Sequence, residues 1–120
     1  MSINRAYKLL PKPVTNILLS YEAWIVGSGV DWYLSGGEDC QPKDIDILVS
    51  PHKLQEACRI LSDQVFTVNR FGGLNTTVDQ VKVDLIPLNL EEYFRYTPKN
   101  QINKALRISP YTLVVEDSRT

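Results

Sequence analysis

Three short apolar runs constrain the fold of this chain most strongly. The first is followed by small residues, and the other two contain aspartates. The first covers residues 24–26 and stops at Gly27-Ser28-Gly29. The second opens with Asp44-Ile45-Asp46 and continues to residue 49, and the third, residues 81–86, carries Asp84. Short apolar runs rich in valine and isoleucine are typical of buried strands. Because alternate side chains share one face of a strand, the two aspartates of the second run should point the same way.

Helical spacing appears before and after these runs. Apolar residues at positions 14, 17, 18 and 21 recur as they do along one face of a helix. Residues 30–34 show the same spacing up to Gly36-Gly37, which is a typical helix end. Ser50-Pro51 predicts the N-cap and first position of a further helix. That helix would run to about residue 62 and bury Leu54, Ala57, Cys58 and Leu61.

The second half of the chain predicts mostly strands. Residues 74–78 and 81–86 are separated only by Asp79-Gln80, and a connection of two residues predicts a hairpin. We also expect strands over residues 65–68 and 111–115 and a helix over residues 90–96. A chain of 120 residues has the size of one domain. We therefore expect a single domain over residues 1–120, of the α/β (α+β) class, with a central mixed β-sheet flanked by helices.

The composition is that of an ordinary globular protein. Hydrophobic residues make up 43% of the chain, and the formal net charge of -1 provides no global basic field for nucleic acid. Cys40 and Cys58 are too few for a disulfide framework or a zinc ribbon. No apolar stretch approaches the length of about 20 residues that a membrane helix needs. We expect a cytoplasmic protein with reduced thiols and no membrane partner.

One local group of basic residues lies near the C-terminus. It is accompanied by aromatic residues at positions 93, 94 and 96, a combination that can bind nucleic acid. A solvated helical face explains the same pattern more simply, and we adopt that interpretation. The basic residues are Arg95, Lys99, Lys104 and Arg107.

The spacing of the glycines and aspartates indicates a site for a nucleotide and magnesium. A strand that ends at Gly27 and Ser28 can present backbone amides, together with the Ser28 hydroxyl, to phosphate oxygens. Carboxylate oxygens suit Mg²⁺. If their strands are neighbours in one sheet, Asp44, Asp46 and Asp84 would form a cluster of three carboxylates.

Simpler interpretations of the same residues remain open. Asp44 can be a loop residue and Asp46 a solvated strand residue. Asp84 can belong to an edge strand on which it and Lys82 both face water. Lys43 adjoins the carboxylates and is a candidate phosphate contact, but an exposed charge at the end of a loop is the simpler interpretation.

Taken together, these residues resemble the pattern of the nucleotidyltransferase superfamily typified by DNA polymerase beta. That pattern is a hydrophobic residue, Gly, Gly or Ser, then Asp-x-Asp on the next strand and a third Asp further on. The matching residues are Val26, Gly27, Ser28, Asp44, Asp46 and Asp84. More narrowly, residues 20–30 and 34–46 look like the head domain of class II CCA-adding enzymes and bacterial poly(A) polymerases. Where that family has Arg-Asp after the valine of its glycine motif, this chain has Asp31-Trp32.

The resemblance implies a minimal nucleotidyltransferase fold and a metal-dependent transferase. An acceptor hydroxyl would attack the α-phosphate of a nucleoside triphosphate, with ATP as the expected nucleotide, and pyrophosphate would leave. The acceptor would be an RNA 3′ end, a protein or a small molecule, supplied with a partner chain where it is a macromolecule. Two Mg²⁺ ions would be held by Asp44, Asp46 and Asp84, and the nucleotide by Gly27, Ser28, Gly29 and Lys43.

Two other classes of function share some of these features. A nucleotidyltransferase-like fold can serve as a catalytically weak or inactive binding or regulatory module that acts with a partner chain. Clustered acids also occur in two-metal nucleases. A nuclease does not need a Gly-Ser turn before its Asp-x-Asp, so we rank that class last.

Overall fold

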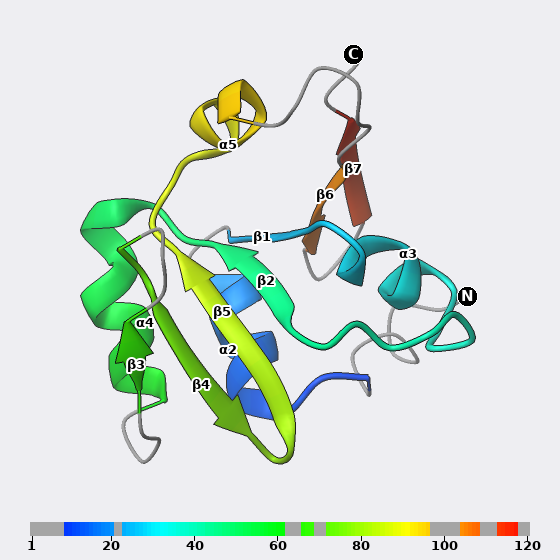
Figure 1. Ribbon diagram of the computed structural model, residues 1–120, viewed down its shortest axis with the longest axis horizontal. Helices are drawn as coiled ribbons and strands as arrows, with labels where there is room; N and C mark the ends of the chain where they lie inside the picture. The colour runs from blue at the N-terminus through cyan, green and yellow to red at the C-terminus, as the bar shows by residue number, and fades with distance from the viewer. Residues whose placement is uncertain are drawn as a thin grey trace.

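The fold is known from a computed structural model, which describes residues 9–20, 23–61, 66–68, 72–96, 104–108 and 113–117. Within these residues the chain forms helices around one sheet (Figure 1). The helices are α2 (Lys12–Ser20), α3 (Gly29–Leu34), the 3-10 helix η1 (Pro51–Lys53), α4 (Leu54–Ile60) and α5 (Leu90–Tyr96). The strands are β1 (Trp24–Val26), β2 (Ile45–Leu48), β3 (Thr67–Val68), β4 (Leu74–Val78), β5 (Val81–Ile86), β6 (Lys104–Ile108) and β7 (Leu113–Asp117).

The sheet has seven strands in the order β3-β4-β5-β2-β1-β6-β7. Strands β2 and β5 pair in parallel, whereas every other neighbouring pair is antiparallel. The expected α+β class with a central mixed sheet flanked by helices is therefore confirmed. Among the described residues, no helix is long and apolar enough to cross a membrane.

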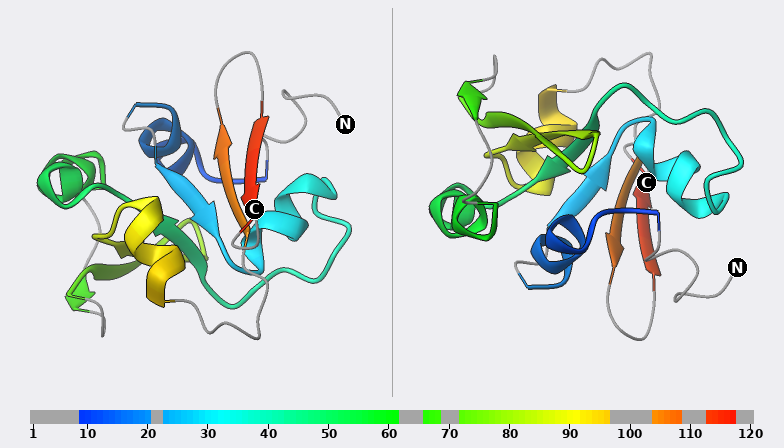
Figure 2. Two further views of the ribbon diagram at one scale, coloured as in Figure 1. Left: turned by 90° about the horizontal axis from the view of Figure 1, so that it is seen from above. Right: turned by 90° about the horizontal axis from the view of Figure 1, so that it is seen from below.

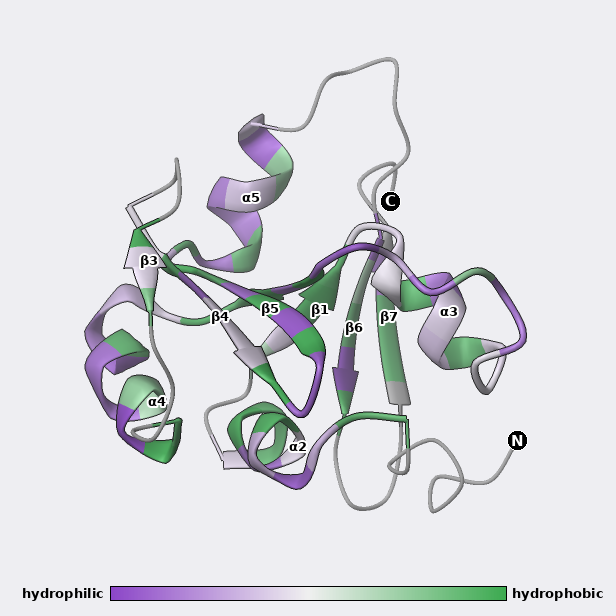
Figure 3. Cartoon of the chain, turned by 60° about the horizontal axis from the view of Figure 1, so that its bottom comes forward, coloured by the Kyte–Doolittle hydropathy of each residue, from purple (hydrophilic) through white to green (hydrophobic). Residues whose placement is uncertain are grey.

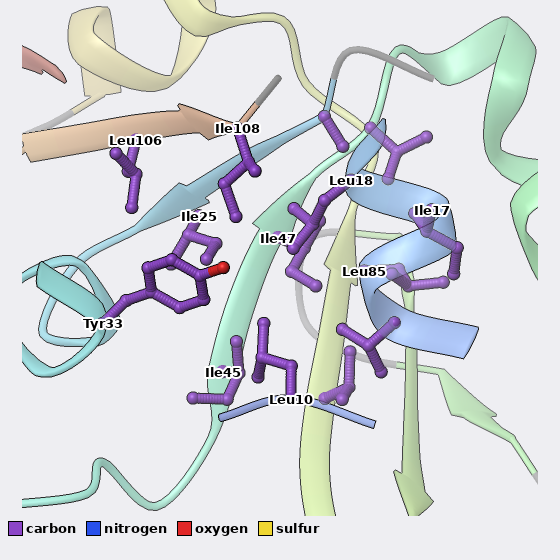
Figure 4. Packing of buried hydrophobic residues seen from close by; sticks show 14 of the residues in the cluster. Leu10, Ile17, Leu18, Ile25, Tyr33, Ile45, Ile47, Leu85, Leu106 and Ile108 are labelled. Carbon is purple, nitrogen blue, oxygen red and sulfur yellow. The ribbon is translucent and has the colours of Figure 1, made fainter. Parts of the chain in front are cut away.

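The larger core lies on the face of the sheet that α2 covers. Ile25, Ile47 and Leu85 project from three adjacent strands and pack with Ile17 and Leu18 of α2 (Figure 4). All five side chains are fully buried. Burial of one such side chain contributes about 1.5–3 kcal/mol to stability. This face therefore holds the strands in place.

A smaller cluster lies on the opposite face. Val26, Leu48, Ile86 and Ala105 are buried there, with the partly buried side chains of α5 against them. Figure 2 shows α2 and α5 on opposite sides of the sheet. Both helices have a hydrophilic and a hydrophobic side (Figure 3). The sheet thus carries the main core and α2 on one face, and the smaller cluster and α5 on the other.

The expected turns are confirmed by their backbone geometry. After α3, Gly36 adopts φ +72°, its amide donates to Tyr33 O, and the Gly37 amide donates to Trp32 O. This is a Schellman helix end, in which glycine tolerates the left-handed backbone. Asp79 and Gln80 join β4 to β5 with φ of 48° and 69°, as in a type I′ hairpin turn.

Several boundaries differ from those expected. The first helix begins at Lys12, and the strand expected over residues 44–49 is limited to Ile45–Leu48, so Asp44 precedes it. Ser50 and Pro51 do start a helical segment, but its first turn is the 3-10 helix η1 and the Ser50 side chain makes no capping bond. Residues 65 and 111, where two further strands were expected to begin, lie outside the described residues.

The interpretation of the C-terminal basic residues as a helical face is wrong for Lys104 and Arg107. Both lie on β6, which pairs with β1 and β7. The strand shows no alternation in the sequence because Ala105 and Leu106 are both buried, on opposite faces of the sheet. Arg95 does lie on helix α5, whereas Lys99 is outside the described residues.

Candidate functional site

Asp46 and Asp84 are brought together by the parallel pairing of β2 with β5, in which they are direct register partners. Partners in neighbouring strands point to the same face of a sheet. Asp46 is also the partner of Val26 on β1, and Asp84 of Asn75 on β4. One line of side chains therefore crosses four strands on a single face, with two carboxylates in the middle.

This line lies on the same face as the cluster beneath α5. Leu48 and Ile86 follow Asp46 and Asp84 by two residues and are buried in that cluster. The two aspartates are only partly buried. The carboxylates consequently lie next to an apolar cluster and still reach solvent.

Asn75 belongs to this site, although the sequence reasoning did not identify it. Its Nδ2 donates to Asp84 Oδ1 at 2.6 Å. The sequence does contain the information needed to place Asn75. A two-residue turn at 79–80 pairs residue 78 with 81, and the same register pairs residue 75 with 84.

Gly27 lies beside Asp46 at the end of β1. Its φ is +71°, and a Cβ added there would be 3.7 Å from Asp46 Oδ2. The Gly27 amide donates a hydrogen bond to the carbonyl oxygen of Lys104 on β6, with a nitrogen–oxygen distance of 3.3 Å. This amide is therefore already paired within the sheet. The glycine permits a left-handed turn that other residues adopt at a cost.

Ser28 and Gly29 lead from this turn into α3. Ser28 is exposed, and its side chain makes no capping hydrogen bond. Gly29 is buried, and a Cβ there would be 3.1 Å from Ile25 Cγ2. Close packing against β1 therefore explains the glycine at position 29.

Asp44 and Lys43 lie just before β2. Asp44 is partly buried, and Lys43 is exposed. No group of three or more His, Cys, Asp or Glu side chains in the described part of the chain is arranged to hold a metal ion. The structure thus brings Asp46 and Asp84 together, whereas the participation of Asp44 stays a prediction.

A basic side chain lies near the glycine turn as well. Lys104 Nζ is 3.2 Å from Asp31 Oδ1, and the two side chains are 40% and 60% exposed. Lys104 is also the residue whose carbonyl accepts from Gly27. The chain thus places a cation from β6 beside Asp31.

Comparison with known proteins identifies no relative of this chain. It matches no protein-family model, no curated protein and no solved structure.

Proposed function

We propose that this chain is a Mg²⁺-dependent nucleotidyltransferase that transfers a nucleoside monophosphate from a nucleoside triphosphate to a hydroxyl acceptor. The observation that carries the proposal is the direct pairing of Asp46 with Asp84, next to Gly27 at the end of β1. The resemblance described above points to the same chemistry. ATP is the proposed nucleotide.

The carboxylate pair fits a hard divalent cation. Two like charges on adjacent strands repel each other, and a cation between them removes that cost. Mg²⁺ is typically held by one or two carboxylates together with substrate phosphates and waters, so Asp46 and Asp84 supply enough protein ligands for one ion. Asp44 would complete the ligand set for a second ion. When bound, Mg²⁺ would neutralise negative charge on the phosphates and lower the pKa of the attacking hydroxyl.

The glycine turn is the proposed phosphate-binding element. The amide of Gly27 is engaged by Lys104 O, so the amides of Ser28 and Gly29 are the candidate donors to the β- and γ-phosphates. The exposed Ser28 hydroxyl would add a third donor. Lys43, exposed at the end of its loop, would contribute positive charge.

The proposed reaction forms a bond between the acceptor oxygen and the α-phosphorus and breaks the bond from that phosphorus to pyrophosphate. The hydroxyl gives up its proton to solvent water, and pyrophosphate leaves with the electron pair of the broken bond. The residues of this chain bind and align the triphosphate between the turn and the carboxylate pair. The acceptor is an RNA 3′ end, a protein or a small hydroxyl compound, and a partner chain would hold a macromolecular acceptor.

The test is a transfer assay with each α-labelled nucleoside triphosphate, Mg²⁺, and RNA, protein and small hydroxyl acceptors. Label should move to an acceptor with the wild-type protein and not with Asp46→Ala. Asp39→Ala, which removes an exposed loop carboxylate, should retain transfer. Transfer that survives Asp46→Ala would contradict the proposal. Nucleotide binding without transfer to any acceptor would favour the binding or regulatory module instead.

A further inference from the structure

We infer that Asn75 is a positioning residue that sets the orientation of the Asp84 carboxylate and so tunes the Mg²⁺ affinity of the site. The inference rests on the proposed function, since it assumes that Asp84 is a metal ligand. It assigns a role to a residue on β4, a strand that contributes no ligand itself.

The contact between the two side chains is short and well placed. Asn75 Nδ2 lies 2.6 Å from Asp84 Oδ1, whereas N–H···O bonds in proteins cluster near about 2.9 Å. Hydrogen bonds to an ionised acceptor are shorter and stronger than those between neutral groups. The antiparallel register and the tight turn at 79–80 fix the spacing of the two backbones. Asn75 is thus held in position by the hairpin.

The orientation of Asp84 matters because of its neighbour on the other side. Asp46 is the register partner of Asp84 on β2, and repulsion between the carboxylates would turn them apart. A donor on the β4 side draws Asp84 Oδ1 toward β4. Because the carboxylate is planar, fixing one oxygen also fixes the direction of the other. The bond from Asn75 therefore favours one orientation of the carboxylate before any ion binds.

Residues that hydrogen-bond a metal ligand commonly change metal affinity when they are mutated, by about tenfold to hundredfold. Asn75→Ala should therefore raise the Mg²⁺ concentration needed for half-maximal nucleotide binding by about tenfold or more. Asn75→Gln keeps an amide donor on a longer side chain and should recover part of this loss. Thr77→Ala is the matched control, because Thr77 lies on the same strand and face and is exposed.

The experiment is a Mg²⁺ titration at fixed nucleotide, with binding of a fluorescent nonhydrolysable ATP analogue as the signal. Melting temperatures of all variants show whether each remains folded. A rise in the Mg²⁺ midpoint for Asn75→Ala, with Thr77→Ala at the wild-type value, would support the positioning role. Equal midpoints for the wild type and Asn75→Ala would overturn it. Absence of Mg²⁺-dependent binding by the wild-type protein would instead refute the proposed function.

A second measurement does not depend on nucleotide. The side-chain amide signal of Asn75 in a ¹⁵N NMR spectrum should shift when Mg²⁺ alone is added, because the bond to Asp84 responds to the ion. Asp84→Asn should abolish that response. An Asn75 signal unchanged by saturating Mg²⁺, while the signals of Asp46 and Asp84 shift, would overturn the inference.

Discussion

Asp46 and Asp84 are register partners on the parallel strands β2 and β5, although they are 38 positions apart along the chain. The pairing places two carboxylates side by side on one face of the sheet. Like charges at such positions destabilise a sheet unless a cation compensates them. Replacing one of the two carboxylates by a neutral amide therefore tests how much this repulsion costs the protein without metal.

Asp46→Asn should stabilise the metal-free protein, because it removes the repulsion without changing the shape of the side chain. The expected gain is about 0.5 kcal/mol in the free energy of unfolding, measured by urea denaturation in EDTA. Asp39→Asn serves as the control in an exposed loop and should have no effect. A loss of stability in Asp46→Asn would show that repulsion is not the dominant effect at this position.

Gly73→Ala should strongly destabilise the fold. A Cβ at this position would overlap the backbone carbonyl oxygen of Leu85, the residue after Asp84. We expect a loss of about 3 kcal/mol in the free energy of unfolding. Gly72→Ala is the matched control, since its φ is +79° but nothing lies within 4 Å of the added Cβ, and it should lose only about 1 kcal/mol. Equal losses for the two variants would mean that β4 and β5 do not approach as closely as described.

Gln80→Gly should stabilise the protein by about 1 kcal/mol. Gln80 adopts φ of 69° in the hairpin turn, where glycine carries no steric penalty and Asp-Gly is a preferred pair. Thermal and urea unfolding will measure the change. Gln55→Gly, at an exposed position inside α4, should instead destabilise by about 1 kcal/mol. A decrease in stability on Gln80→Gly would exclude the type I′ turn.

Cys40 should react with iodoacetamide faster than Cys58. Cys40 is exposed, whereas partial burial raises the pKa of the Cys58 thiol and so lowers its thiolate fraction near neutral pH. The labelling rate of Cys58 should therefore rise at a higher pH than that of a free thiol such as N-acetylcysteine, over about pH 7 to 10. Peptide mass spectrometry separates the two sites. Identical pH profiles would contradict the burial of Cys58 against the core.

Much of the fold could be predicted from short-range spacing. The hairpin followed from the two residues between β4 and β5, and the end of α3 followed from Gly36-Gly37. Strand β6 could not be predicted, because Ala105 and Leu106 are buried on opposite faces and leave no alternation. When both faces of a short strand are buried, its sequence lacks the alternation of apolar and polar residues from which a strand is predicted.

The site was predictable only in part, for a related reason. The spacing of Asp44 and Asp46 indicates a shared face if both lie on a strand, but β2 begins at Ile45. The pairing of β2 with β5 depends on how the chain between them crosses over, which local spacing does not determine. The position of Asn75 could have been predicted from the sequence, since the hairpin register alone places it opposite Asp84.

The most direct measurement is isothermal titration calorimetry of the wild-type protein, Asp46→Asn and Asp84→Asn with a nonhydrolysable ATP analogue, in Mg²⁺ and in EDTA. The wild-type protein should bind the nucleotide in Mg²⁺ and not in EDTA, and each variant should bind at least about tenfold more weakly, since each loses one of the two paired carboxylates. Wild-type binding of equal strength in EDTA, or no binding in either condition, would contradict a metal-nucleotide site at this carboxylate pair.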